Sequence, residues 1–299
     1  MNVLIIGSKG FIGTHAYSFF SRKQNTVCWG CDVVADYNDD RYFLLDAVDS
    51  DYRETFEKAS FDICINCSGT GSVPGSFKGP QRDFNLNVFA VIKILDAIRK
   101  YAPGCKFINL SSAAVYGNPQ RLPVTETDSC SPVSPYGLHK QFAENICLEY
   151  HTYFGLQTCS LRIFSAYGPG LKKQLFWDIF KKAKQPDGVT LFGTGLETRD
   201  FIYIIDLLHA IDLVIAKGSF DGSIYNVGNG VETEIRTVAE SLLNSLNYKG
   251  PLSFSGSNRT GDPIKWRADI SRIQSLGYQQ CYSLEQGIKQ FVLWATEKE

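Results

Sequence analysis

The feature that constrains this chain most is a glycine-rich turn near its start. Residues 3–6 form an apolar, strand-like run, three glycines follow at intervals of three, and residues 11–20 carry apolar side chains at helical spacing. Such a turn is tight, and the helix after it offers free amides and a partial positive charge to a phosphate. We therefore expect a dinucleotide pyrophosphate here. The residues expected around it are Gly7, Gly10, Phe11, Ile12 and Gly13.

Strand-like and helical runs then alternate through the first half of the chain. The further expected strands are residues 27–32, 63–67 and 106–110, and the further expected helices are residues 83–101 and 136–153. This alternation predicts an α/β fold with a Rossmann-type doubly wound parallel sheet. We expect residues 1–164 to form this dinucleotide-binding domain.

The alternation loosens beyond about residue 165, where glycine and proline breaks interrupt the pattern. This change predicts a smaller α/β C-terminal domain over residues 165–299, mainly for substrate binding. Segments near residues 200–227 are expected to return to the first domain.

Asp32 ends the second expected strand, about twenty residues after the glycine turn. A carboxylate at this place accepts both hydroxyls of an adenosine ribose and repels a 2′-phosphate. Lys9, in the turn itself, is a cation that could attract such a phosphate. The prediction is therefore NAD, with NADP as the open alternative.

Composition narrows the remaining classes. A chain of 299 residues with 44% hydrophobic content can bury a large core, and a net charge of -1 gives no global field for a nucleic acid or an anionic membrane. No apolar run reaches about 18 residues, the length that would suggest a membrane span. Nine cysteines, an odd number, favour a reducing compartment over a disulfide framework. We expect a cytoplasmic protein.

Two C-x-x-C spacings raise the possibility of a metal site. Cys28 and Cys31 lie in one strand-like run, and Cys64 and Cys67 lie in another. Positions three apart on a strand point to opposite faces of the sheet, so they cannot ligate one ion together. The four histidines form no spaced ligand pair, and no metal site is expected.

Three polar residues form a candidate catalytic group. Tyr136 and Lys140 are four apart at the start of an expected helix and hence on one face. A nearby cation lowers the pKa of a phenol, which makes tyrosine usable as a base. Ser112 follows the strand at 106–110, and ligands of this fold bind at that edge of the sheet.

These motifs together resemble the extended short-chain dehydrogenase/reductases, the sugar-nucleotide epimerase and dehydratase family, over nearly the whole chain. The resemblance implies that Ser112 is the active-site hydroxyl and that Tyr136 is the catalytic base. It implies that Lys140 binds the nicotinamide ribose and tunes the tyrosine. The family's homodimers imply pairing through the helices at 83–101 and 136–153.

Further segments resemble the family's cofactor site. Asp46 is similar to the acid beside the adenine, and Ser68 with Gly69 to the small pair after the next strand. Asn87 is similar to the family's helix asparagine. The resemblance thus implies that all four positions contact the dinucleotide.

The second half resembles the family's substrate site. Residues 198–202 and 259–263 resemble segments whose arginines bind a nucleotide-sugar diphosphate, which implies roles for Arg199, Arg259 and Asp262. A guanidinium fork suits phosphate oxygens. Ser165 is a departure, because the family usually has asparagine there; serine has less reach and no amide.

The residues after Ser112 bear on the reaction. The family's dehydratases carry acidic residues there, and its 3,5-epimerase/4-reductases usually carry a cysteine, whereas this chain has Ala113 and Ala114. The resemblance therefore favours an NAD-dependent 4-epimerase of the UDP-hexose type. A 4-keto-6-deoxy sugar-nucleotide reductase remains the alternative. A third hypothesis is a non-catalytic dinucleotide sensor. Such a protein is expected to lack one of the three catalytic residues, and all three are present here.

Overall fold

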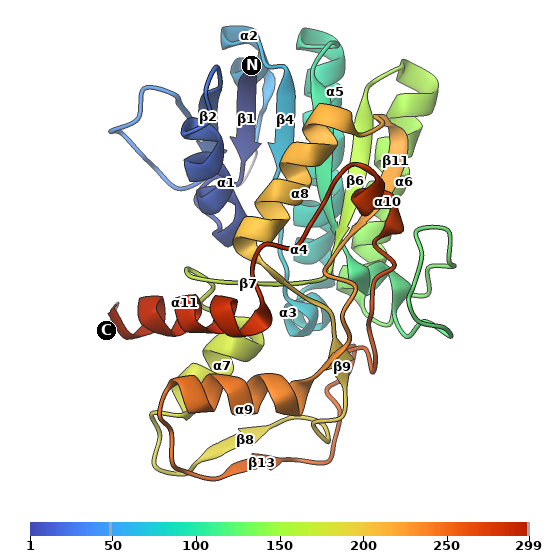
Figure 1. Cartoon of the computed structure of the whole chain (residues 1–299). Coiled ribbons are helices and arrows are strands. Elements are labelled where there is room, and N and C mark those ends of the chain that lie inside the picture. Colours follow the sequence, from blue (N-terminus) through green and yellow to red (C-terminus); the bar gives the residue numbers. More distant parts are fainter. Residues whose placement is uncertain (48–49, 298–299) are drawn as a thin grey trace.

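The computed structural model describes residues 1–47 and 50–297. Its centre is a parallel seven-stranded sheet with the strand order β11-β6-β5-β4-β1-β2-β3 (Figure 1). The strands are β1 (Asn2–Ile6), β2 (Val27–Asp32), β3 (Tyr42–Leu44), β4 (Ile63–Asn66), β5 (Lys106–Ser112), β6 (Thr158–Ile163) and β11 (Asp221–Val227). The predicted doubly wound parallel sheet is confirmed.

Helices cover both faces of this sheet. The helices of the first half are α1 (Phe11–Ser21), α2 (Arg53–Lys58), α3 (Val73–Lys78), α4 (Pro80–Phe84), α5 (Ala90–Tyr101) and α6 (Pro135–Phe154). The helix expected at 83–101 is divided, because the π-helical turn η1 (Asn85–Phe89) joins α4 to α5. A short 3₁₀ helix, η2 (Ala113–Tyr116), follows β5.

The apolar core lies in two main layers, one on each face of the sheet. One layer contains the buried residues of α1 and of α8 (Ile204–Lys217), and the other contains those of α2, α5 and α6. Cys28 belongs to the first layer and Cys31 to the second. These two cysteines therefore face opposite sides of the sheet, as the strand period requires.

Most of the second half of the chain gathers beyond the carboxyl ends of the strands (Figure 1). Its helices there are α7 (Gln174–Lys182), α9 (Ile235–Ser245) and α11 (Leu284–Glu297), whereas the short helix α10 (Ser271–Ser275) packs against β11 at the edge of the main sheet. Its small strand pairs are β7 (Ser165–Tyr167) with β10 (Phe201–Tyr203), β9 (Thr198–Arg199) with β12 (Thr233–Glu234), and β8 (Val189–Leu191) with β13 (Leu252–Phe254).

Two later elements return to the first half. Helix α8 packs against α1, and β11 extends the main sheet beside β6. Both elements lie between residues 200 and 227. Within the described part of the chain, no helix combines the length and apolar character needed to cross a membrane.

Candidate functional site

A cleft of about 640 Å³ lies between the sheet and the second half of the chain. Gly10, Phe11 and Ile12 line one end of it, and Arg199 and Arg259 line the other. The remaining lining residues that the sequence pointed to are Ser68, Gly69, Ser112, Tyr136, Lys140, Ser165 and Asp262. The structure thus brings most of the expected site residues into one cavity.

The glycine turn at the first end leaves no room for side chains. Gly7 has φ +77°, and a Cβ there would lie 2.6 Å from the Ser68 nitrogen. A Cβ on Gly13 would lie 2.0 Å from the Gly7 oxygen. Gly10 is the residue just before α1, so the amides that follow it are free to meet a phosphate.

Asn87 gives an independent indication that a polar ligand belongs here. Its side chain is 2% exposed, yet neither its amide nitrogen nor its oxygen has a hydrogen-bond partner. A Cβ on Gly69 would lie 2.6 Å from that oxygen, so the asparagine closely approaches the lining of the cleft. Buried polar groups normally have partners, and a dinucleotide in this cleft would supply them.

Asp32 and Lys9 both already have partners within the protein. Asp32 ends β2, and its carboxylate accepts hydrogen bonds from the backbone amides of Lys9 and Val33 at 2.8 and 2.7 Å. The Lys9 ammonium forms an ion pair with Asp36 and lies over the Tyr42 ring. The lysine charge is therefore already partly neutralised.

Asp46 lies just after β3 and is exposed. Its backbone oxygen accepts a hydrogen bond from the Ser50 hydroxyl at 2.8 Å. The residue does not line the main cleft, so the role beside the adenine stays a prediction.

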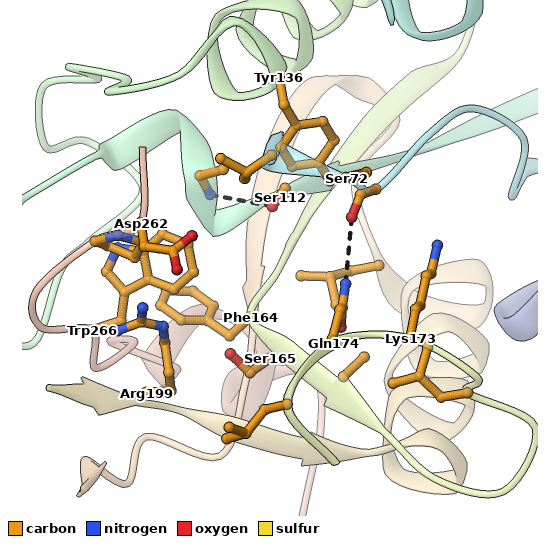
Figure 2. Close-up of a pocket in the computed structure, with 18 of the residues that line it drawn as sticks. Ser72, Ser112, Tyr136, Phe164, Ser165, Lys173, Gln174, Arg199, Asp262 and Trp266 are labelled. Carbon is orange, nitrogen blue, oxygen red and sulfur yellow. Dashed lines mark hydrogen bonds between the residues drawn. The ribbon is translucent and has the colours of Figure 1, made fainter. Parts of the chain in front are cut away.

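The candidate catalytic residues Ser112, Tyr136 and Lys140 all line this cleft, and Figure 2 shows Ser112 and Tyr136 close together in it. Ser112 ends β5, and its Oγ accepts a hydrogen bond from the Ala114 amide at 3.2 Å. Lys140 is 7% exposed, donates from Nζ to the Leu110 carbonyl at 2.9 Å, and lies 6.0 Å from the centre of the Tyr136 ring. The three residues come from β5 and α6, which pack together.

Burial dominates the titration of this group. It raises the pKa of Tyr136, and a hydrogen bond with Ser112 opposes that change. This direction is opposite to the lowering expected from Lys140 alone. Burial also lowers the pKa of Lys140 to about 8, while the Asp83 carboxylate favours the charged form. The lysine thus titrates close to physiological pH.

The far end of the cleft combines cations with aromatic rings. Arg199 lies 5.3 Å from the centre of the Trp266 ring, and Arg259 lies 4.6 Å from that of Phe192. Burial lowers the pKa of Arg199 to about 10, although nearby Asp262 favours its charged form. Forked cations suit a diphosphate, and aromatic rings suit a planar base.

Comparisons with known proteins agree with this geometry. The family model described as the NAD dependent epimerase/dehydratase family matches residues 3–228. The chain belongs to this family. It is therefore an enzyme, and NAD is its cofactor.

Individual relatives match over nearly the full length of the chain. A UDP-glucuronate 4-epimerase of Arabidopsis thaliana is 27% identical, with 98% of this chain and 75% of the relative covered. An uncharacterized UDP-glucose epimerase of Bacillus subtilis (strain 168) is 29% identical, with 96% of each covered. The crystal structure of UDP-glucuronic acid 4-epimerase from Bacillus cereus, in complex with UDP-glucuronic acid and NAD, has a TM-score of 0.91, 25% identity and full coverage of both chains.

Several lining residues of this epimerase/dehydratase were not identified from the sequence. Phe192, Trp266, Lys173 and Gln174 line the cleft together with Ser165, which lies on β7. Each comes from a loop or an element end of the second half, and no motif marks them. Only the tertiary arrangement brings them to the sugar-nucleotide end and the centre of the cleft.

Proposed function

We propose that this epimerase/dehydratase inverts the configuration at C4 of a UDP-linked hexose and regenerates its NAD in every turnover. The observation that carries the proposal is the position of the triad of Ser112, Tyr136 and Lys140. It lies in one cleft between the glycine turn and the arginine pair. The 4-epimerase names of several relatives support the same reaction.

The residues of the chain have separate roles in this reaction. NAD, held at the glycine turn and Lys140, would supply a hydride acceptor for the first half-reaction and a hydride donor for the second. Tyr136 accepts the proton of the 4-hydroxyl and gives it back, and Ser112 donates a hydrogen bond to the sugar oxygen. Lys140 holds positive charge beside the phenol. Because the keto sugar must present both faces, the arginines are best suited to hold the diphosphate rather than the ring.

Alanines after Ser112 support epimerisation over elimination. Ala113 and Ala114 are both buried, and neither can act as an acid or base. Loss of water from C5 and C6 needs such a group, whereas hydride transfer at C4 does not.

Product analysis tests the proposal. The purified enzyme is incubated separately with UDP-glucose, UDP-N-acetylglucosamine and UDP-glucuronic acid, and the products are resolved by ion-exchange chromatography and NMR. We expect at least one C4 epimer, with no net change at the reduced-nicotinamide absorbance band. Stoichiometric oxidation of added NADH or NADPH by a 4-keto-6-deoxy sugar nucleotide, with all three substrates untouched, would instead assign a reductase.

We also propose a homodimer that pairs through α5 and α6. The support is an apolar surface on and beside these helices, where Phe84 contacts Phe142 and Arg99 contacts Phe154. Its exposed members are Phe84, Phe89, Tyr101, Leu138, Phe142, Leu148, Tyr153 and Phe154. Light scattering should give the mass of a dimer, and F142E should shift it toward the monomer.

The cytoplasm is the proposed location. All nine cysteines are free, and eight of them are buried or half-buried, which suits a reducing compartment. Fractionation of the producing cells tests this, with the protein expected in the cytoplasmic fraction.

A further inference from the structure

Residues 168–174 form a strap across the dinucleotide end of the cleft. At its beginning, the Pro169 carbonyl accepts a hydrogen bond from His15 Nε2 on α1 at 2.7 Å. At its end, Gln174 Nε2 donates to the Gly71 carbonyl, in the loop after β4, at 3.4 Å. The strap therefore spans two walls that both belong to the first half of the chain.

The middle of the strap lies close to the glycine turn. A Cβ on Gly170 would lie 3.7 Å from both the His15 ring and the Phe11 ring. Phe11 is the first residue of α1, where a pyrophosphate is expected to meet the backbone amides. The strap thus passes beside the phosphate-binding end of the helix.

Lys173 is one of two lysines in the strap, and it is the one that lines the cleft. A Cβ on Gly71 would lie 3.7 Å from its ammonium nitrogen. Figure 2 shows it on the opposite side of the cleft from Arg199, with Gln174 and Ser165 between them. Among the described residues, no carboxylate forms an ion pair with it. Surrounding protein lowers the pKa of Lys173 by displacing water, an effect that a bound anion would oppose.

Other cations near the dinucleotide end are already engaged. Lys9 is paired with Asp36, and Lys140 donates to the Leu110 carbonyl beside the catalytic tyrosine. With Lys9 paired to Asp36, the glycine turn supplies backbone amides and the partial charge of α1. A pyrophosphate bound there would keep most of its negative charge without a further cation.

We propose that Lys173 binds the pyrophosphate of the bound dinucleotide, and that the strap at 168–174 thereby slows release of NAD. The inference goes beyond the proposed reaction, because it concerns a binding residue that acts in the absence of any sugar. A retained cofactor suits an enzyme that recovers its hydride in each turnover. The binding step holds even if the reaction were different.

Direct measurement of NAD release tests the proposal. The variants are K173M, which removes the charge, and K173R, which keeps it. K172M is the matched control, because Lys172 is adjacent and, like Lys173, exposed, but it does not line the cleft. Dissociation of NAD is followed by competition with a fluorescent dinucleotide analogue at low and high salt, with circular dichroism as the check on folding.

We expect K173M to release NAD about tenfold faster at low salt, since charge-assisted hydrogen bonds to phosphate are the stronger class. The difference should shrink at high salt, because screening weakens the lost interaction. K172M should match the wild type, and K173R should restore most of the retention. ADP-ribose, which carries the same pyrophosphate, should show the same order of variants.

Two results would overturn the inference. One is an unchanged NAD dissociation rate in a folded K173M. The other is weaker binding of UDP-sugars with dinucleotide binding intact, which would place the ammonium against the sugar. Failure of the epimerase assay alone would leave these binding measurements unaffected, so the two proposals fail separately.

Discussion

In the proposed division of the cleft, its two ends recognise phosphate in different ways. At the dinucleotide end, glycines bring the backbone close to the ligand, and the first turn of α1 supplies the donors. At the sugar-nucleotide end, Arg199 and Arg259 supply charged side chains set against aromatic rings. The first end depends on glycines, which have no side chain and let the backbone approach the ligand, whereas the second end depends on charged arginine side chains.

This difference has a thermodynamic consequence. A backbone site is pre-organised by the sheet and helix that hold it, so its amides lose little freedom when the ligand binds. Long arginine side chains lose rotamer freedom on binding, and burial already makes the charge of Arg199 costly. Tight retention at the first end and exchange at the second is what a 4-epimerase requires.

The sharpest separation between binding and chemistry should come from Tyr136→Phe at the centre of the cleft. We expect kcat to fall by about a hundredfold or more, because the variant cannot transfer the proton. Affinities at both ends should stay within a factor of two or three of the wild type. Steady-state kinetics together with separate titrations of NAD and UDP measure this. Turnover near that of the wild type would remove Tyr136 from the mechanism.

Replacing the arginines should affect one end alone. Arg199→Ala or Arg259→Ala should weaken UDP binding by about 1.5–3 kcal/mol, the scale of hydrogen bonds to charged groups. Binding of NAD should not change. Arg121→Ala is the control, because Arg121 is a surface arginine paired with Asp128 and its side chain is 72% exposed. Calorimetry with each ligand gives the answer, and equal losses for both ligands would contradict the division of the cleft.

The same contrast explains what the sequence could predict. The glycine turn lies within seven consecutive residues, and its spacing reflects local geometry, so it predicted both the fold and the dinucleotide end. Tyr136 and Lys140 are likewise one helical turn apart. The sugar-nucleotide end gathers side chains from several distant segments, and only resemblance to a family pointed to its two arginines.

Other features depended on energies that no local pattern reveals. The sequence predicted one helix at 83–101, but the π-helical turn at Asn85–Phe89 divides it and places Asn87 in a buried position. The direction of the Tyr136 pKa was also different from that expected, because burial outweighs the effects of nearby groups. Lys173 lies in no recognised motif, so only the structure shows that it lines the cleft.

Charge at the outer part of the dinucleotide end should decide cofactor choice. Asp32→Asn should weaken NAD binding. It should also reduce the preference of the enzyme for NAD over NADP by about tenfold, because the 2′-phosphate of NADP no longer meets a carboxylate. Asp36→Asn is an informative partner, since it releases Lys9 from its ion pair and should improve NADP binding alone. Dissociation constants of both cofactors at one salt concentration test this. Unchanged preference in Asp32→Asn would place the ribose elsewhere.

The smallest expected effect concerns Asp83, which links the wall of the cleft to α6, the helix that carries Tyr136 and Lys140. Asp83 on α4 is 2% exposed and accepts hydrogen bonds from His139 Nδ1 at 2.6 Å and from Thr70 Oγ1, in the cleft wall, at 3.2 Å. Its carboxylate helps to keep Lys140 charged, while burial lowers the pKa of that lysine to about 8. Activity that needs the charged lysine should therefore fall as the pH rises through about 8.

Asp83→Asn removes the negative charge that opposes the effect of burial. The pKa of Lys140 should then drop further, and the alkaline limb of kcat/KM should move to lower pH by about half a unit. Glu144 also favours the charged lysine and is unchanged in this variant, so the shift stays modest. Asp96→Asn, at a surface ion pair on α5, is the control and should leave the profile in place. A uniform loss of activity at every pH, with the limb unmoved, would mean that Asp83 only holds the helices together and does not tune the lysine.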